Sequence, residues 1–338
     1  MLKKAFKPRI GMLCLACLAV CLITVPAEAA FPERPIRLIV HTDAGGGADT
    51  NIRRIQPYLE KELGVPLALE NRPGAASMLG PKMLSESEGD GYTIGMAGSP
   101  NTELGLLTMD GMFAPDSICM LGSLTQDAAV IMVRKDSPWN TFEELVKDAK
   151  SRPGKITASI GTATSDNFIG LRLIEKEAGI DLNIVSFGGG SPARLALIGG
   201  HVDLTHSSLF AALSILDSVK ILAVHWEKNN WPELTDNAPT VVSMYPNIGK
   251  VNCGTMDLLV APASLKTNYP ERYLFIAKAF ENAANNPEFR ASLEETGQLG
   301  LWNNKNHDEL TEYYFENLKS FESYLDYFKE DVEQRKAP

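Results

Sequence analysis

Short apolar segments with strand character alternate with segments of helical character over most of this chain. Alternation of this kind is typical of α/β layers, in which helices connect parallel strands. Strands are expected at residues 36–41, 67–70, 93–97, 130–133, 156–159, 184–187, 204–206, 221–225 and 256–260. The order of the segments therefore predicts an α/β fold.

The first 30 residues have the three parts of a secretory signal. Four basic residues precede an apolar run at residues 10–25, and Ala27-Glu28-Ala29 forms a small-residue cleavage site. The apolar run is short for a spanning helix, so we expect cleavage near residue 30 and a periplasmic location. A membrane anchor and lipid attachment at Cys17 or Cys21 are the alternatives.

Cleavage would leave about 308 residues, a length that favours two lobes over one core. The net charge is −10 for the full chain, and it becomes −13 when residues 1–29, with four basic and one acidic residue, are removed. Nucleic acids and anionic lipids are therefore poor partners. Cys119 and Cys253 would be the remaining cysteines, expected as small buried hydrophobic residues, with a disulfide as the alternative.

Three helices can be placed from periodicity and capping signals. Residues 49–63 carry an apolar stripe, and Pro57 is expected to kink or split this helix. Thr141 and Glu144 form a capping box at the start of a helix over residues 141–150. Residues 307–334 form a long amphipathic helix whose stripe is expected to pack on its own lobe rather than in a dimer, so a monomer is expected.

Three glycines separate an apolar strand from a helix start at residues 38–49. Glycines reach backbone angles that let successive N–H groups converge, and the positive end of the helix dipole adds to them. A carboxylate or phosphate would fit there, although a Gly-rich turn is more often a plain tight connection.

Two further loops of this kind follow later strands. Residues 161–167 carry glycine, hydroxyl and amide groups before a helix, and residues 187–192 carry three glycines and a proline. Because ligands in open α/β sheets bind beyond the carboxyl ends of strands, the three loops together predict a binding site. Simple N-capping by Ser165 or Asp166 is the alternative for the second loop.

Motifs for nucleotide binding, hydrolysis and metal binding are missing from the sequence. It contains neither Gly-x4-Gly-Lys-Ser/Thr nor Gly-x-Ser-x-Gly. His201 and His206, with Asp203 between them, fit no established metal-ligand spacing. We therefore expect neither a cofactor nor a metal, and a binding protein rather than an enzyme. An exported α/β hydrolase or lyase acting on a carboxylated substrate, using Asp43 or His201, is the alternative.

Short motifs spread over nearly all of the mature chain carry a resemblance to a known family. They are FPERPIRLIV at 31–40, AGGGAD at 44–49, ENRPGA at 70–75, DGYT at 90–93, PGKI at 153–156, GGHVDL at 199–204 and APT at 238–240. With these motifs the chain resembles the extracytoplasmic solute receptors of the tripartite tricarboxylate transporter family, often called Bug receptors.

The resemblance implies a two-lobe periplasmic binding protein fold, type II-like, whose cleft closes on a small organic carboxylate, a di- or tricarboxylate or an aromatic acid. It also implies large and small integral membrane subunits as partners. The loop after the first strand would hold a carboxylate, and residues 161–167 would contact the other end of the ligand, partly through water. Many relatives carry His where Asn167 falls.

Asp43 is a second departure from the family pattern. It is expected to cap the turn, but facing the cleft it would favour a zwitterion or an amide-bearing ligand. We expect lobe one at residues 31–132 plus 254–338 and lobe two at 133–253, joined by two crossing strands. The expected ligand-binding residues are Thr42, Asp43, Ala44, Gly45, Gly46, Gly47, Ala48, Asp49, Ser99, Thr162, Thr164, Ser165, Asp166, Asn167, Gly189 and Asp203.

Overall fold

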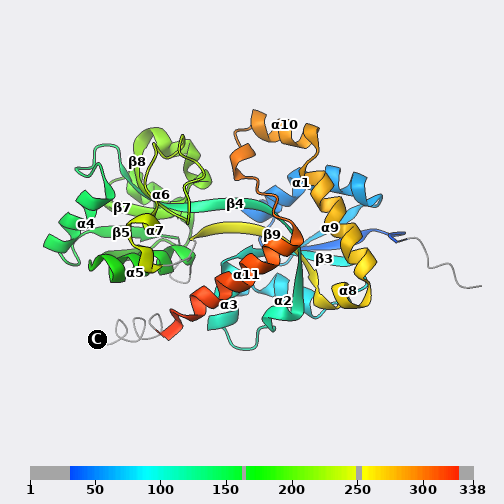
Figure 1. Ribbon diagram of the computed structural model, residues 1–338. Helices are drawn as coiled ribbons and strands as arrows, with labels where there is room; N and C mark the ends of the chain where they lie inside the picture. The colour runs from blue at the N-terminus through cyan, green and yellow to red at the C-terminus, as the bar shows by residue number, and fades with distance from the viewer. Residues whose placement is uncertain (1–30, 162–164, 249–252, 327–338) are drawn as a thin grey trace, which may run out of the picture.

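The computed structural model describes residues 31–161, 165–248 and 253–326. Figure 1 shows two α/β lobes joined by two long strands, β4 (Ile118–Arg134) and β9 (Gly254–Pro262). The α/β fold class is thus confirmed. The secretory signal expected at residues 1–30 lies outside the described residues.

In lobe one, β1 (Ile36–Val40) lies between β2 (Leu67–Asn71) and β3 (Thr93–Ser99) and is parallel to both. β9 is antiparallel to β3 and to the first part of β4. The carboxyl ends of β1 and β3 therefore lie at one edge of the sheet, next to the crossing strands.

Lobe two contains β5 (Thr157–Ile160), β6 (Asn183–Ser186), β7 (Leu204–Ser208) and β8 (Val219–His225). β4 pairs with β9 as far as Ala128 and with β7 and β8 from Ala129 onward, antiparallel throughout. β5 lies between β6 and β7 and is parallel to both. One continuous strand therefore belongs to both sheets.

Helices cover the faces of both sheets (Figure 1). Those of lobe one are α1 (Gly47–Leu63), α2 (Leu79–Ser85), α3 (Asn101–Thr108), α8 (Ala263–Asn268), α9 (Pro270–Ala284), α10 (Pro287–Glu295) and α11 (His307–Glu322). Those of lobe two are α4 (Phe142–Ser151), α5 (Asp166–Ala178), α6 (Gly190–Ile198) and α7 (Val241–Met244). The short 3-10 helices are η1 (Ala75–Ser77), η2 (Pro115–Ser117), η3 (Phe210–Ser218), η4 (Pro246–Ile248) and η5 (Leu299–Leu301).

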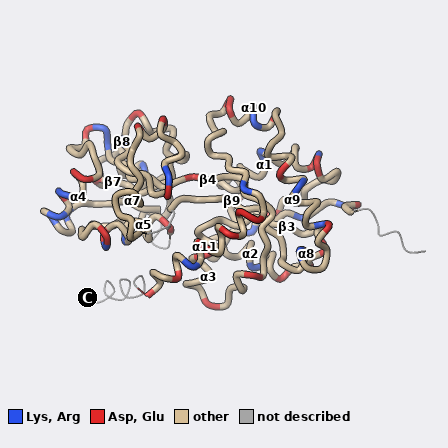
Figure 2. The backbone as a smooth tube through the Cα atoms, in the orientation of Figure 1, with Lys and Arg blue, Asp and Glu red and all other residues tan. Residues whose placement is uncertain are grey.

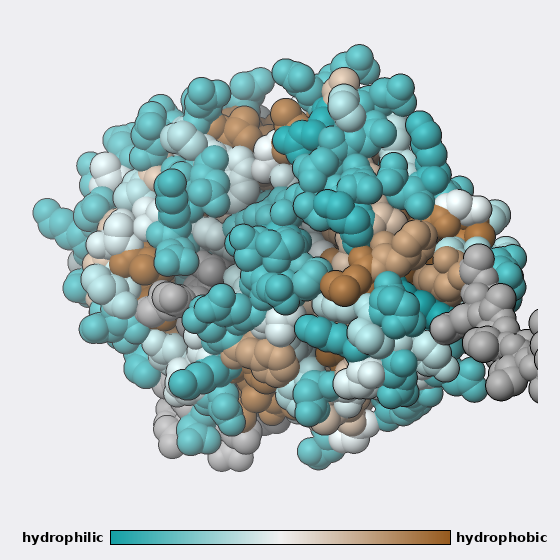
Figure 3. All heavy atoms as spheres, turned by 45° about the vertical axis from the view of Figure 1, so that its right-hand side comes forward, coloured by the Kyte–Doolittle hydropathy of each residue, from teal (hydrophilic) through white to brown (hydrophobic). Residues whose placement is uncertain are grey.

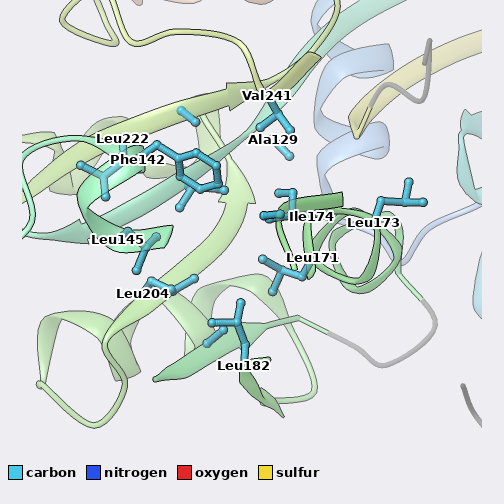
Figure 4. Packing of buried hydrophobic residues seen from close by; sticks show 14 of the residues in the cluster. Ala129, Phe142, Leu145, Leu171, Leu173, Ile174, Leu182, Leu204, Leu222 and Val241 are labelled. Atoms are coloured by element: carbon cyan, nitrogen blue, oxygen red, sulfur yellow. The ribbon is translucent and has the colours of Figure 1, made fainter. Parts of the chain in front are cut away.

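Each lobe has its own hydrophobic core. In lobe one, Ile52, Ile55 and Leu59 of α1 are fully buried in a cluster that also includes side chains of α9. In lobe two, Phe142 of α4 and Leu222 of β8 belong to one cluster, part of which Figure 4 shows. Burying a side chain of this size contributes about 1.5–3 kcal/mol, so each cluster stabilises the fold of its own lobe.

α1 is not split at Pro57, because one helix runs from Gly47 to Leu63. Pro57 lies on the exposed face, where water can hydrogen-bond the Arg53 carbonyl that the proline leaves without a donor. The apolar stripe predicted for this helix is buried, which leaves another face of α1 available to the space between the lobes.

The capping pattern expected at α4 is present in a modified form. Thr141 Oγ1 accepts a hydrogen bond from Glu144 N at 3.2 Å, as a capping box requires. Glu144 Oε2, however, accepts from Asn140 N at 2.6 Å rather than from the amide of Thr141 itself.

α11 packs against both lobes of the same chain. Leu310 and Tyr314 are buried with residues of β4 and β9, whereas Phe321 belongs to the lobe-two core. Beyond the helix, Tyr324 Oη donates to Asn247 O at 2.8 Å. Residues 327–334 of the expected helix lie outside the described residues.

Charged residues are spread over both lobes (Figure 2), and the face in Figure 3 is mainly hydrophilic with small, separate hydrophobic patches. Within the described ranges, no helix combines the length and the hydropathy that crossing a bilayer requires. Cys119 and Cys253 are both free, so the disulfide alternative is not adopted.

Candidate functional site

A cleft of about 490 Å³ lies where the ends of β1 and β3, the crossing strands and lobe two meet. α1 supplies one wall, alternate residues of β4 and β9 supply the floor, and Ser208 and Phe210 of lobe two supply the opposite wall. Ligand sites occur preferentially at such interfaces between domains. The cleft is therefore the candidate binding site.

The first turn of α1 presents unused backbone donors to this cleft. Gly46 N donates to Asp43 O and Thr50 N donates to Gly46 O, both at 2.9 Å. No side chain caps the helix, and the amides of Gly47, Ala48 and Asp49 have no acceptor among the described residues. Three free amides at the positive end of a 17-residue helix make an anion-binding position.

Asp49 holds the glycine turn in shape. Its Oδ2 accepts from Gly45 N and from Arg53 Nε, and its Oδ1 accepts from Asn71 Nδ2, each at 2.9 Å. The hydrogen bond from Arg53 is the main reason why the pKa of this carboxyl falls to about 2, so it is ionised. Gly45 has a φ of 81°, a conformation that favours glycine. Asp49 therefore positions the loop through its side chain.

One face of α1 lines the cleft with residues at helical spacing: Gly47, Thr50, Asn51 and Arg54. Arg54 Nη1 is buried and has no hydrogen-bond partner in the described part of the chain. A buried donor without an acceptor costs about 1–3 kcal/mol, more for a charged group. An anionic ligand would satisfy it.

The floor of the cleft carries two carboxylates on facing strands. Asp257 lies opposite Thr125, and Asp127 lies opposite Thr255, so all four side chains point to one face. Asp257 Oδ2 accepts from Asn51 Nδ2 at 2.7 Å and from Thr125 Oγ1 at 3.1 Å.

Asp127 connects the floor of the cleft to lobe two by hydrogen bonds. Its two oxygens accept from Ser208 Oγ and from Phe210 N, the latter at 3.0 Å. Burial raises the pKa of this carboxyl to about 7, against the opposing effect of those hydrogen bonds. Sequence reasoning missed Asp127 and Asp257, because their burial depends on the pairing of β4 with β9.

A strained segment borders the same cleft. Ala75, Ala76 and Ser77 have φ values of 46°, 51° and 72°, in the left-handed region, and Ser77 lines the cleft. Each such residue costs roughly 1–2 kcal/mol, and conformations of this kind cluster at ligand-binding sites.

Of the expected site residues in lobe one, five line the cleft: Thr42, Gly45, Gly47, Ala48 and Ser99. Ser99 already donates its hydroxyl to Glu103 Oε1 at 2.5 Å. Asp43 is exposed, and its carbonyl rather than its carboxylate closes the turn. Ala44, Gly46 and Asp49 belong to the same turn but are not among the lining residues.

Those of the expected lobe-two residues that the structure describes do not line the cleft. Ser165 caps α5 by accepting from Phe168 N at 3.3 Å, and Asp166 Oδ2 accepts from Gly254 N at 2.8 Å. Burial raises the pKa of Asp166 to about 6. The carbonyl of Asn167 is bonded to His206 Nδ1 at 3.0 Å.

The other expected residues of lobe two are placed as follows. Gly189 lies where the two lobe-two glycine loops meet, because Gly161 packs against the backbone of Gly189 and Gly190. Asp203 accepts from Thr157 N at 2.8 Å, at the amino ends of β5 and β7, because it precedes its strand instead of following it. Thr162 and Thr164 lie outside the described residues.

The buried histidines of lobe two form a structural pair. His225 Nδ1 lies 3.2 Å from His206 Nε2, and burial lowers the pKa of both rings, that of His206 to about 4. In the ranges that the structure describes, no three His, Cys, Asp or Glu side chains are placed to hold a metal ion.

Two α/β lobes that enclose a cleft and share two crossing strands define the class of periplasmic solute-binding proteins. The chain matches the model of the "Tripartite tricarboxylate transporter family receptor" over residues 51–322, and it belongs to that family. The resemblance drawn from the sequence motifs is thereby confirmed.

Individual relatives agree with this assignment. The "UPF0065 protein in gbd 5'region" of Cupriavidus necator is 30% identical over 298 residues, which cover 87% of this chain and 88% of the relative. A TctC solute-binding protein from Polaromonas, solved without ligand, is 24% identical with a TM-score of 0.73, covering 88% of this chain and 99% of its own.

MatC from Rhodopseudomonas palustris, solved with bound malate, is 22% identical with a TM-score of 0.68, covering 87% of this chain and 100% of its own. These two solved structures confirm the two-lobe fold. The family and these structures are binding proteins rather than enzymes, so the expected receptor is confirmed over the exported hydrolase or lyase.

Proposed function

We propose that this protein is exported to the periplasm, binds a small organic acid in the cleft, and passes it to the large and small integral membrane subunits of a tripartite transporter. The free amides of Gly47, Ala48 and Asp49 together with Arg54 hold a carboxylate of the acid. The family assignment supports the transport role. MatC, which was solved with malate, supports a small organic acid as the ligand.

The unused donors of α1 carry this proposal. A hydrogen bond to a charged group contributes about 1.5–3 kcal/mol, so a few of them, less the cost of ordering the ligand, correspond to roughly micromolar binding or tighter. The field of the acidic protein opposes an anion, and the local donors must overcome it.

Closure of the lobes would complete the site. The lobe bounds proposed from the sequence are residues 31–132 plus 254–338 for lobe one and 133–253 for lobe two, close to the change of strand partners between Ala128 and Ala129. Ser208, at the carboxyl end of β7, lines the cleft already. β5 is parallel to β7, so the loop at 161–167 follows a strand end on the same edge. On closure the described residues of this loop and Gly189 would approach the far end of the ligand, and these contacts would make the ligand favour the closed form.

The proposal is tested with a panel of mono-, di- and tricarboxylic and aromatic acids, followed by thermal unfolding, calorimetry and a measurement of acid consumption. We expect at least one acid to raise the melting temperature without being consumed. Native mass spectrometry of freshly purified protein should identify a co-purified acid. Turnover, or no stabilisation by any acid, would contradict the proposal.

A matched pair of variants on α1 places the carboxylate. Arg54→Gln should weaken acid binding about 10- to 100-fold, because one charge-assisted hydrogen bond is lost. Lys61→Gln removes a charge from an exposed position near the other end of the same helix and should leave the affinity unchanged. Equal affinities of the two variants would remove Arg54 from the site.

A further inference from the structure

Asp257 has an unused oxygen at the floor of the cleft. The residue is 9% exposed, and its Oδ2 takes the hydrogen bonds from Asn51 and Thr125. Its Oδ1 has no partner among the described residues, although the residue lines the cleft. A nearly buried carboxylate needs further donors to offset its loss of hydration. This oxygen is open to the cleft, so either water or a donor group of the ligand can supply that hydrogen bond.

His41 points to the same need. It is 4% exposed, it lines the cleft, and neither ring nitrogen has a hydrogen-bond partner within the described ranges. Its ring packs on Gly98, where an added Cβ would lie 3.2 Å from His41 Cε1, and Gly98 is directly opposite Asp257 in the β3–β9 ladder. Burial lowers the pKa of the ring, against the opposing effect of the Asp257 charge, so the ring is neutral and one of its two buried nitrogens is an acceptor near that carboxylate.

α1 places the partner of Asp257 close to the proposed carboxylate position. Asn51, which donates to Asp257, is four residues from Gly47 on α1, about 6 Å along the helix axis. An α-amino acid carries its ammonium one carbon atom from its carboxylate, so it is short enough for two positions that lie about one helical turn apart.

The charges that line the cleft favour the same class of ligand. Within the described lining, Arg54 is the basic side chain of permanent charge, and Asp127 and Asp257 are the acidic ones. A dicarboxylate would bring two negative charges to a floor that already carries Asp257 and Asp127, the latter partly ionised with its pKa of about 7. A zwitterion brings its positive charge to that floor, which makes charge complementarity a source of specificity.

We propose that Asp257 and His41 form an ammonium subsite and that the solute is an amino acid, whose carboxylate binds at the start of α1. This inference rests on the proposed function and names the ligand class within it. Asp43, the residue considered for this role from the sequence, is exposed and does not line the cleft.

Matched pairs of ligands that differ only in the ammonium group test this inference. The twenty L-amino acids and their deaminated counterparts, such as glutarate for L-glutamate and propionate for L-alanine, are screened by thermal unfolding and measured by calorimetry. We expect a hit among the amino acids that binds at least tenfold more tightly than its deaminated counterpart.

The isosteric variant Asp257→Asn should weaken the binding of that amino acid at least tenfold. It should also narrow the difference in affinity between the amino acid and its deaminated counterpart. Asp116→Asn, at an exposed position of lobe one outside the cleft, is the control and should bind as the unmodified protein does. The comparison of ligands on the unmodified protein decides the question even if Asp257→Asn fails to fold.

Three outcomes separate the two proposals. A preference for amino acids that Asp257→Asn removes supports the ammonium subsite. Binding of deaminated acids at least as tight as that of their amino counterparts overturns the subsite and leaves the carboxylate receptor standing. Stabilisation by neither class, and by no acid of the wider panel, overturns both.

Discussion

Replacing Gly47 by proline would delete one backbone donor of the proposed carboxylate site while keeping the helix. Proline is well tolerated at the first helical position, where its missing N–H serves no intrahelical bond. Gly46 has φ −68° and ψ 169°, the extended conformation that a residue before proline adopts. A Cβ at Gly47 meets nothing within 4 Å, so this atom of the proline or alanine side chain has room.

The loss expected for Gly47→Pro follows from one hydrogen bond to a charged acceptor. Such a bond contributes about 1.5–3 kcal/mol, which corresponds to an increase in Kd of about 10- to 150-fold at 25 °C. Thermal stability should change little, because the helix keeps all of its internal hydrogen bonds.

Calorimetry with the tightest-binding solute provides the assay, and Gly47→Ala provides the control. Alanine adds a side chain at the same position but keeps the N–H, so it separates the loss of the donor from the effect of added bulk. If Gly47→Pro binds as tightly as Gly47→Ala, the start of α1 does not hold the solute, and the reasoning from its free amides is refuted.

Two further predictions concern the glycine turn before α1 and the buried carboxyl of Glu103 in α3. Gly46→Val should abolish binding, because a Cβ there would lie 2.9 Å from Asp43 O and displace the turn; unchanged affinity would exclude the turn from the site. Burial raises the pKa of Glu103 from 4.5 to about 7, against the effect of its bonds from Ser99 and Asn317, so the unfolded chain loses this proton first as the pH rises. Relative to Glu103→Gln, the protein should therefore lose about 3 kcal/mol of unfolding free energy between pH 4.5 and 7, measured by urea unfolding; a pH-independent difference would contradict the raised pKa.

Local signals located the lobe-one part of the site. The apolar strand and three glycines at 38–49 predicted the end of β1 and the turn before α1, because turn geometry depends on nearby residues. The role of Asp49 was harder to see, since its carboxylate serves Gly45, Arg53 and Asn71, and Asn71 comes from another strand.

The floor of the cleft was missed for a different reason. Strand prediction from apolar runs found residues 130–133 and passed over the rest of β4, in which Ser123, Thr125 and Asp127 are polar and buried. Their burial depends on pairing with β9, more than 100 positions away, which no local pattern encodes. Asp203, which was expected in the site from the sequence, lies at the amino end of β7 because it precedes this strand, and it does not line the cleft.

Because β4 runs without a break through both sheets, it couples the cleft that holds the solute to the relative orientation of the two lobes. The strand changes partners between Ala128 and Ala129, next to Asp127 on the floor. A rotation of one lobe against the other would therefore twist β4 near this point, beneath the bound solute. In the proposed transport function, membrane subunits that contact the outer surfaces of both lobes would distinguish a loaded receptor by the angle between the lobes, without contacting the solute.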